Sequence, residues 1–362
     1  MSEALALQVV NGLAEEDMMQ VRVAVMMAAA TMVTLIGSST ATAAARDQGG
    51  DDDRQAGKSF TFAVIGDIPY GDAQIAAFPG RIAQLNADPQ VQLVNHLGDI
   101  KSGSSVCSDE YYAARRSDFD RFADPLVYTP GDNEWTDCHR VNNGGYNPLE
   151  RLAAVRADFF PTPGQTLGQH PIEVDSQNAD GYPENVSYQR AQVAFAAVHI
   201  VGSNNSLVPW TGNTAPTAEQ TAEVLGRTAA DIQLIRDTFK QARSHRDRAV
   251  VLLTQADMFD PTITNPAFAD YYAFQPIVAA IARESARFGG PVYLFNGDSH
   301  VFSQDQPLAA GSTWLSFYGV TTPAPNLARV TVEGSTGVDE WLKVTIDKHN
   351  PAVLNIEHIA FS

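Results

Sequence analysis

The sequence has few cysteines and few basic residues, and each shortage excludes a class of protein. Two cysteines in 362 residues lack the Cys-x-x-Cys spacing, which argues against a cysteine-bound zinc site. Lys and Arg number 24 against 42 Asp and Glu, and the formal charge of -18 disfavours nucleic acids and anionic membranes as partners. The chain has no internal repeat, so repeat architectures are excluded. What remains is 44% apolar, enough to bury a large core.

The N-terminus is typical of a secretory signal peptide spanning 1–45. An apolar run at 23–37 leads into small residues suited to cleavage. Acidic residues at 15–17 are unusual before such a run, so we expect translation to start at Met18 or Met19. A membrane anchor is the alternative, although the run is short for a full span. We therefore expect a secreted or periplasmic protein with no stable membrane span after cleavage.

Export has a consequence for the two cysteines. In an oxidising compartment Cys107 and Cys138 are expected to form a disulfide, with free thiols as the alternative. A polar stretch without periodicity at 46–59 predicts a flexible linker. The folded domain then spans 60–362.

Apolar runs alternate with helical patterns along this domain, which predicts an α/β fold. Strands are expected at 60–65, 91–97, 126–129, 249–253 and 292–295. Helices are expected at 73–85, 109–122, 149–160, 217–243 and 277–288, with an interruption of the first at Pro79. The alternating stretch 186–201 predicts a hairpin. Short strands at 314–317, 327–332, 341–346 and 353–361 predict a second, mostly antiparallel sheet packed on the first.

Four predicted strands end in the dipeptide Gly-Asp. The aspartates are Asp67, Asp99, Asp132 and Asp298. Because the carboxyl ends of parallel strands hold the ligands of open α/β sheets, we expect one carboxylate cluster on one rim of one sheet. Ordinary turn chemistry is the alternative for each dipeptide taken singly. Four converging carboxylates repel one another unless cations intervene, which predicts bound metal.

The ordered motifs resemble those of the calcineurin-like metallophosphoesterases, whose relatives include the purple acid phosphatases. The resemblance spans about 60–300 and rests on the four Gly-Asp ends, Leu-Leu-Thr-Gln255 and Asn-Gly-Asp298-Ser-His300. It implies a four-layer α/β/β/α sandwich of two packed mixed β-sheets flanked by helices. It also implies that the domain at 60–362 is catalytic.

The resemblance implies a ligand set residue by residue. One metal would be held by Asp67, Asp99 and His300, and a second by Asp99, Asp132, Gln255 and Asp298. Pro69 stands where the family has a ligand His. The remaining donors are mostly oxygens, which favours one or two Mg²⁺, Mn²⁺ or Ca²⁺ ions over Zn²⁺ or Fe. Gln255 as a structural hydrogen-bonding residue is the alternative.

The sequence lacks the family's proton donor at the expected position. Asn133 stands where the family has the His that assists the leaving group, and an amide gives up no proton near neutral pH. His139 and His96 are the candidate replacements, although His96 in a buried strand is also typical of a core histidine. Lys101, Arg140, Asn133 and Tyr70 are candidates to contact substrate, with solvated, salt-bridged or wall positions as the alternatives.

These expectations predict an exported enzyme that hydrolyses a phosphate mono- or diester of a small molecule by metal-activated hydroxide. The alternative is a non-catalytic protein of the same fold that binds a metal or a phosphorylated ligand, because several motif positions are substituted. A purely structural secreted protein would leave the carboxylates unexplained.

Overall fold

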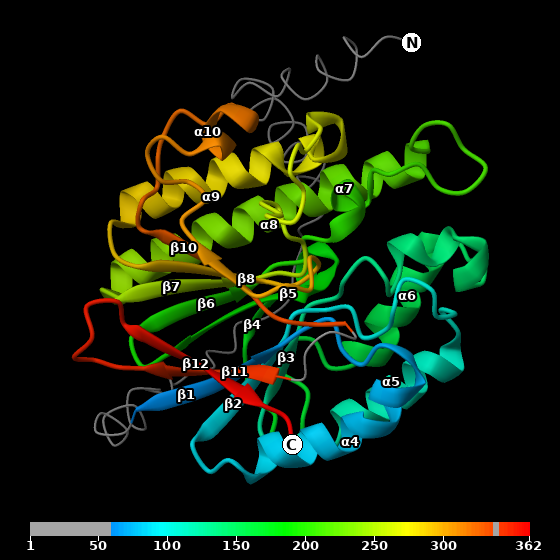
Figure 1. Ribbon diagram of the computed structural model, residues 1–362, viewed down its shortest axis with the longest axis horizontal. Helices are drawn as coiled ribbons and strands as arrows, with labels where there is room; N and C mark the ends of the chain where they lie inside the picture. The colour runs from blue at the N-terminus through cyan, green and yellow to red at the C-terminus, as the bar shows by residue number, and fades with distance from the viewer. Residues whose placement is uncertain (1–58, 336–339) are drawn as a thin grey trace, which may run out of the picture. The chain divides into compact units, whose positions relative to one another are not determined.

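Two mixed β-sheets carry helices on their outer faces in the part of the chain that a computed structural model describes, residues 59–335 and 340–362 (Figure 1). The predicted signal peptide at 1–45, and the predicted linker at 46–59 except for Ser59, lie outside these residues. No helix within the described ranges is long and apolar enough to cross a membrane.

The first sheet has five strands in the order β12-β11-β1-β2-β3. Their bounds are β1 Phe60–Ile65, β2 Val91–His96, β3 Leu126–Tyr128, β11 Glu340–Ile346 and β12 Leu354–Ala360. Strands β1, β2 and β3 run parallel, as their alternation with helices predicts. β11 pairs antiparallel with the other edge of β1 and with β12, which makes the sheet mixed.

The second sheet has seven strands in the order β4-β5-β6-β7-β8-β10-β9. Their bounds are β4 Asp175–Gln177, β5 Tyr182–Arg190, β6 Val193–Ala197, β7 Ala249–Leu253, β8 Val292–Asn296, β9 Ser303–Asp305 and β10 Leu327–Thr331. β5 and β6 form the predicted hairpin. β6, β7, β8 and β10 run parallel, so their carboxyl ends meet at one edge.

The longer helices cover the outer faces of the two sheets. The helices are α4 Gly71–Ala87, α5 Asp109–Phe119, α6 Pro148–Phe159, α7 Gly202–Ser206, α8 Ala218–His245, α9 Gln275–Phe288 and α10 Thr313–Phe317. Short 3₁₀ turns are η2 Thr136–His139, η3 Val141–Asn143, η4 Asn178–Asp180, η5 Phe268–Asp270 and η6 Tyr272–Phe274. α4 continues through Pro79, so the predicted interruption is wrong. Phe78 and Ile82 beside it are buried in the core, and this packing holds the helix across the missing hydrogen bond.

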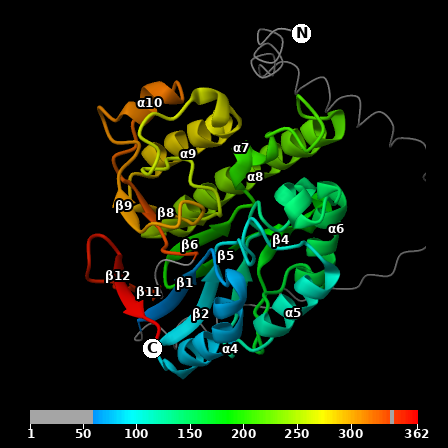
Figure 2. The same cartoon turned by 45° about the vertical axis from the view of Figure 1, so that its right-hand side comes forward.

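Side chains along each strand point alternately to the two faces of its sheet, and this alternation builds the four layers. In β1, Phe62 and Val64 pack against the other sheet, while Ala63 and Ile65 pack against the helices. α4, α5 and α6 cover the first sheet, and α8 and α9 cover the second (Figures 1 and 2). The predicted α/β/β/α sandwich is confirmed.

The prediction that the C-terminal strands alone form the second sheet is wrong. Residues Thr313–Phe317 form helix α10 instead of a strand. β10 lies parallel to β8 in the second sheet, whereas β11 and β12 extend the first. Alternating patterns mark a strand and its buried face, but they do not identify its partner, which depends on which sheet edge the rest of the chain leaves free.

Candidate metal centre

The four Gly-Asp ends converge, but they come from both sheets. Asp67, Asp99 and Asp132 follow β1, β2 and β3 of the first sheet, whereas Asp298 follows β8 of the second. The expectation of one rim of one sheet is therefore wrong. Because the sheets pack face to face, their strand ends meet across the layer boundary, and the carboxylates gather there.

Two of the four glycines, Gly131 and Gly297, leave room for a neighbouring carboxylate. A Cβ at Gly131 would collide with the Asp99 side chain, and a Cβ at Gly297 would collide with that of Asp67. Three of the four aspartates adopt a backbone conformation that residues with side chains seldom occupy, since φ is 54° at Asp67, 55° at Asp99 and 74° at Asp298. Such strained backbone at converging side chains is typical of functional sites.

Two groups of side chains could each hold a cation. Asp67, Asp99 and His300 form one group, and Asp99, Asp132 and Asp298 form the other. In each group one candidate ligand atom per residue lies within 4.8 Å of the others. The His300 Nε2 lies 3.3 Å from the Asp67 Oδ1. Asp99 belongs to both groups.

The electrostatics of the centre fit bound cations. Burial raises the pKa of Asp99 well above its usual range, and the charges of Asp132, Glu134 and Asp67 add to the rise. Burial followed by the charge of Asp132 does the same to the pKa of Asp298. Carboxyls that are expensive to ionise together become stable as anions once divalent cations neutralise them. The donor set, oxygens with one imidazole, suits hard divalent ions.

Gln255 lies at the centre as a hydrogen-bond donor. Its Nε2 is 3.3 Å from both the Asp99 Oδ2 and the Asp132 Oδ1, and its Oε1 accepts from the Gly202 N–H at 2.7 Å. The Gly202 N–H requires an acceptor, so it fixes the amide in this orientation. The oxygen predicted to ligate a metal is thus turned toward the backbone.

Two further polar groups reach Asp99. The Tyr70 hydroxyl donates to the Asp99 Oδ2 at 2.9 Å, and the Asn133 Nδ2 donates to the same oxygen at 2.8 Å. Burial raises the pKa of Tyr70 well above its usual value, and the charge of Asp99 adds to the effect. Tyr70 is therefore a hydrogen-bond donor that keeps its proton near neutral pH.

The structure does not bring the two candidate proton donors into the cluster. The His96 Nε2 contacts the Ile68 carbonyl at 2.9 Å, and its ring packs between Phe119 and Tyr128. Burial lowers the pKa of His96 to about 4, so the ring is neutral. His139 instead contacts the Thr211 backbone N–H and hydroxyl through Nδ1.

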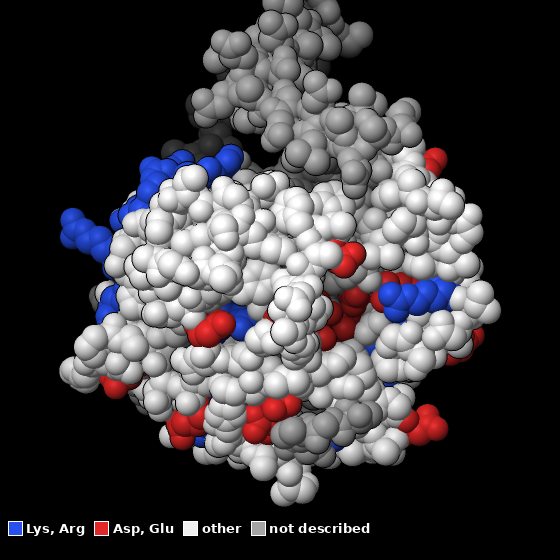
Figure 3. Space-filling model, turned by 45° about the horizontal axis from the view of Figure 1, so that its top comes forward, with Lys and Arg blue, Asp and Glu red and all other residues white. Residues whose placement is uncertain are grey.

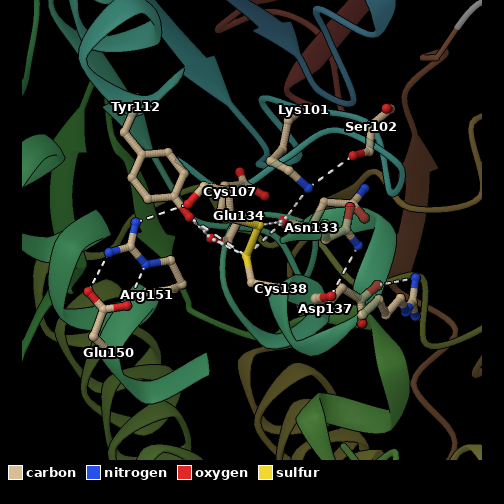
Figure 4. The surroundings of a disulfide bond; sticks show 12 residues. Lys101, Ser102, Cys107, Tyr112, Asn133, Glu134, Asp137, Cys138, Glu150 and Arg151 are labelled. Carbon is tan, nitrogen blue, oxygen red and sulfur yellow. Dashed lines mark hydrogen bonds and ion pairs between the residues drawn. A yellow bond between two sulfur atoms is a disulfide. The ribbon is translucent and has the colours of Figure 1, made fainter. Parts of the chain in front are cut away.

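The two candidate cations for phosphate contact are already engaged. Lys101 is fully buried, and its Nζ donates to the backbone carbonyls of Ser102 at 3.0 Å and Asn133 at 2.8 Å (Figure 4). The Arg140 guanidinium pairs with Asp137 at 2.7 Å. Lys101 thus supports the turn that carries Asp132 and Asn133.

The disulfide between Cys107 and Cys138 is confirmed, with Cα atoms 5.9 Å apart. It joins the segment after β2 to η2, which follows the Asp132 turn (Figure 4). Both sulfur atoms lie within 3.7 Å of the Asn133 carbonyl. The disulfide therefore ties together the two segments that carry Asp99 and Asp132.

Sequence reasoning missed Ser203. Its hydroxyl lies 3.0 Å from the Asp132 Oδ2 and 2.8 Å from the Asp137 Oδ1. A Cβ on the preceding Gly202 would lie 2.6 Å from the Asp132 Oδ2, so this glycine also admits the carboxylate. The signal was present, because the apolar run that includes β6 ends in Gly202-Ser203 in the same way that others end in Gly-Asp.

The fold and the centre together define an α/β sandwich with a carboxylate-rich candidate centre for divalent cations. No protein-family model matches the sequence, and no curated protein matches it. Among solved structures, a purple acid phosphatase from yellow lupin (Lupinus luteus) seeds is similar with a TM-score of 0.45 and 13% identity, covering 84% of this chain and 52% of the lupin chain. This chain therefore spans about half the length of that enzyme. GAP50, the anchor in the inner membrane complex of Plasmodium, is similar with a TM-score of 0.39 and 9% identity, covering 84% and 89%.

Proposed function

We propose that this protein is a metal-dependent hydrolase of phosphate esters. The observation that carries the proposal is the pair of ligand groups that share Asp99. Asp67, Asp99 and His300 would hold one cation, and Asp99, Asp132 and Asp298 the other. Mg²⁺, Mn²⁺ or Ca²⁺ is the expected ion, because the donors are mostly oxygens. Paired divalent cations of this kind make bound water acidic and neutralise the charge of a phosphoryl group.

The neighbouring side chains of this chain supply orientation. The Asn133 amide and the Tyr70 hydroxyl lie 2.9 Å apart and both donate toward Asp99. If bound cations take the place of these donors at Asp99, both would become available to hold oxygens of a phosphoryl group at the edge of the centre. Neither releases a proton near neutral pH. We therefore expect faster hydrolysis of esters whose leaving group departs without protonation, such as aryl esters, than of alkyl esters.

A second candidate function follows because neither candidate general acid lies in the cluster. His96 is buried against Phe119, and His139 is bonded to Thr211. A centre without a placed general acid also fits a non-catalytic protein that binds a metal or a phosphorylated ligand. The two candidates differ in turnover and not in metal content.

One experiment separates the candidates. Metal content and the hydrolysis of aryl phosphate mono- and diesters are measured with Mg²⁺, Mn²⁺, Ca²⁺ and Zn²⁺ for the wild type and Asp99→Asn. Asp237→Asn on α8 is the matched control. The enzyme hypothesis expects bound metal and turnover that Asp99→Asn abolishes and Asp237→Asn keeps. Bound metal without turnover on any ester favours the binding protein. The absence of bound metal under every condition would refute both hypotheses.

We also propose that the protein acts outside the cytosol, secreted or periplasmic. The disulfide between Cys107 and Cys138 supports this, because such bonds persist in oxidising compartments. Fractionation of cells that express the chain with and without residues 1–45 tests the proposal. Equal retention of both forms in the cytosol would refute it.

A further inference from the structure

Exposed apolar side chains gather in the segments that surround the centre. Seven large hydrophobic residues are exposed among the described residues, and one of them, Leu225, lies on the outer helix α8. The others lie in segments that follow β2, β3, β6, β7 and β8. They are Val106, Val141, Val208, Ile263, Phe268 and Val301, between 37% and 83% exposed, and are called the apolar rim below. Since these strand ends meet at the centre, the segments that carry the apolar rim leave the sheets at the same edge as the centre.

Local contacts tie members of the apolar rim to the centre. Val301 directly follows His300. The Val208 N–H donates to the carbonyl of Ser203, whose hydroxyl contacts Asp132. Val141 follows Arg140, and the hydrogen bond between His139 and Thr211 joins the segments that carry Val141 and Val208. Single exposed apolar residues need no explanation, but a set of them around one centre does.

Charge is scarce at this edge. Lys101 is buried and bonded to two carbonyls, and Arg140 pairs with Asp137. In the space-filling view, acidic side chains lie at the bottom of a hollow, and the surface around the hollow is mostly uncharged (Figure 3). An occupant complementary to such a face has one anionic group for a cation-loaded centre and an apolar remainder for the rim. Substrates with several phosphates would find Lys101 and Arg140, the two cations considered among the described residues, already paired.

We propose, building on the phosphoesterase function above, that the apolar rim binds the organic group of the substrate. The preferred substrates are esters that carry a single phosphate and an aliphatic or aromatic group of several carbons. In the reaction, a water oxygen bonds to phosphorus as the water releases one proton to solvent, the P–O bond to the leaving group breaks, and the leaving oxygen departs as an anion that takes up a proton from solvent. The apolar remainder stays against the rim and is recognised by burial, not by charge.

Chain length tests the proposal. kcat/KM is measured for the metal-loaded protein on p-nitrophenyl phosphate diesters whose second group runs from methyl to octyl, so that the leaving group stays constant. Each methylene that becomes buried is expected to raise kcat/KM about two- to fourfold until the rim is covered. Equal rates along the series would overturn the proposal while leaving the phosphoesterase function intact. No hydrolysis of any member, nor of an aryl phosphate monoester, would instead refute the function itself.

Matched substitutions locate the effect. Val141→Asp and Val301→Asp are expected to flatten the dependence on chain length, whereas Leu225→Asp on α8 leaves both the slope and the methyl-ester rate unchanged. Thermal unfolding of each variant checks that it folds, and Val141, at 83% exposure, tolerates the change best. A slope that Leu225→Asp flattens equally would overturn the proposal. So would a dimer that Val141→Asp dissolves in the absence of any dependence on chain length.

Discussion

Removing the Ser203 hydroxyl should weaken one cation site and spare the other. The hydroxyl lies 3.0 Å from the Asp132 Oδ2 and 2.8 Å from the Asp137 Oδ1, and it has one proton to share between them. A hydrogen bond to a charged group contributes about 1.5–3 kcal/mol, which corresponds to about 10- to 100-fold in affinity. Because the proton is shared, we expect about a tenfold loss at the group of Asp99, Asp132 and Asp298 in Ser203→Ala.

The backbone at Ser203 provides an internal control. Its φ of 51° and ψ of 44° lie in the left-handed region, which costs residues with a Cβ about 1 kcal/mol more than glycine. Ser203→Gly and Ser203→Ala therefore remove the same hydroxyl but differ in stability. The two variants should lose the same metal affinity, while the glycine variant unfolds at the higher denaturant concentration.

Calorimetric titration with Mn²⁺ measures both sites of the full chain, with Ser244→Ala on α8 as the control. The expected result is two binding events in the wild type and in Ser244→Ala. In both Ser203 variants one event is weakened about tenfold and the event assigned to Asp67, Asp99 and His300 is unchanged. Wild-type affinity in both variants would show that the hydroxyl does not orient Asp132. Equal weakening of both events would place the effect elsewhere and refute the reasoning.

Three further predictions concern stability. Burial raises the pKa of Asp231 to about 8, so the folded state holds a proton that the unfolded state loses near pH 4, and stability falls as pH rises between these values. In urea unfolding at pH 5, 6 and 7, Asp231→Asn should therefore gain about 1.4 kcal/mol per pH unit over the wild type, and parallel profiles would contradict this. The disulfide closes a loop with a separation of 31 residues, so replacing both cysteines with serine should cost about 3–4 kcal/mol in unfolding free energy, whereas a loss below about 1 kcal/mol would exclude the loop-closure account. Removing metal with a chelator should lower the melting temperature. If the ion had been present at a hundred times its Kd, the loss of unfolding free energy is about 2.7 kcal/mol, and both effects should vanish in Asp99→Asn.

Local signals in the chain were enough for most of the scaffold. The strand β1 and the helix α8 follow from apolar periodicity and capping residues that depend on neighbours in sequence, and Thr217 with Gln220 forms a capping box at the start of α8. The side chain of Asp99 was likewise identified by its place at a strand end. These features involve interactions within a few residues, so one sequence is sufficient to predict them.

Several features of the centre depended on contacts between distant segments. Gln255 was predicted as a ligand, but the Gly202 N–H, far from it along the chain, turns its oxygen away. His96 was a candidate acid, but the packing of α5 against β2 buries its ring. Ser203 follows a glycine after an apolar run, but its contact with Asp132 arises only because the segment after β6 lies beside the Asp132 turn.

The sequence by itself determined that four strand ends would carry an aspartate after a glycine, since a strand and the turn that ends it depend on neighbouring residues. Only the tertiary structure decided that three of them come from one sheet and Asp298 from the other. It also decided that β10 would join β8 while β11 would join β1. The physical reason is that strand pairing and sheet packing depend on which edges and faces remain free once the whole chain has folded. That information is distributed over the entire chain.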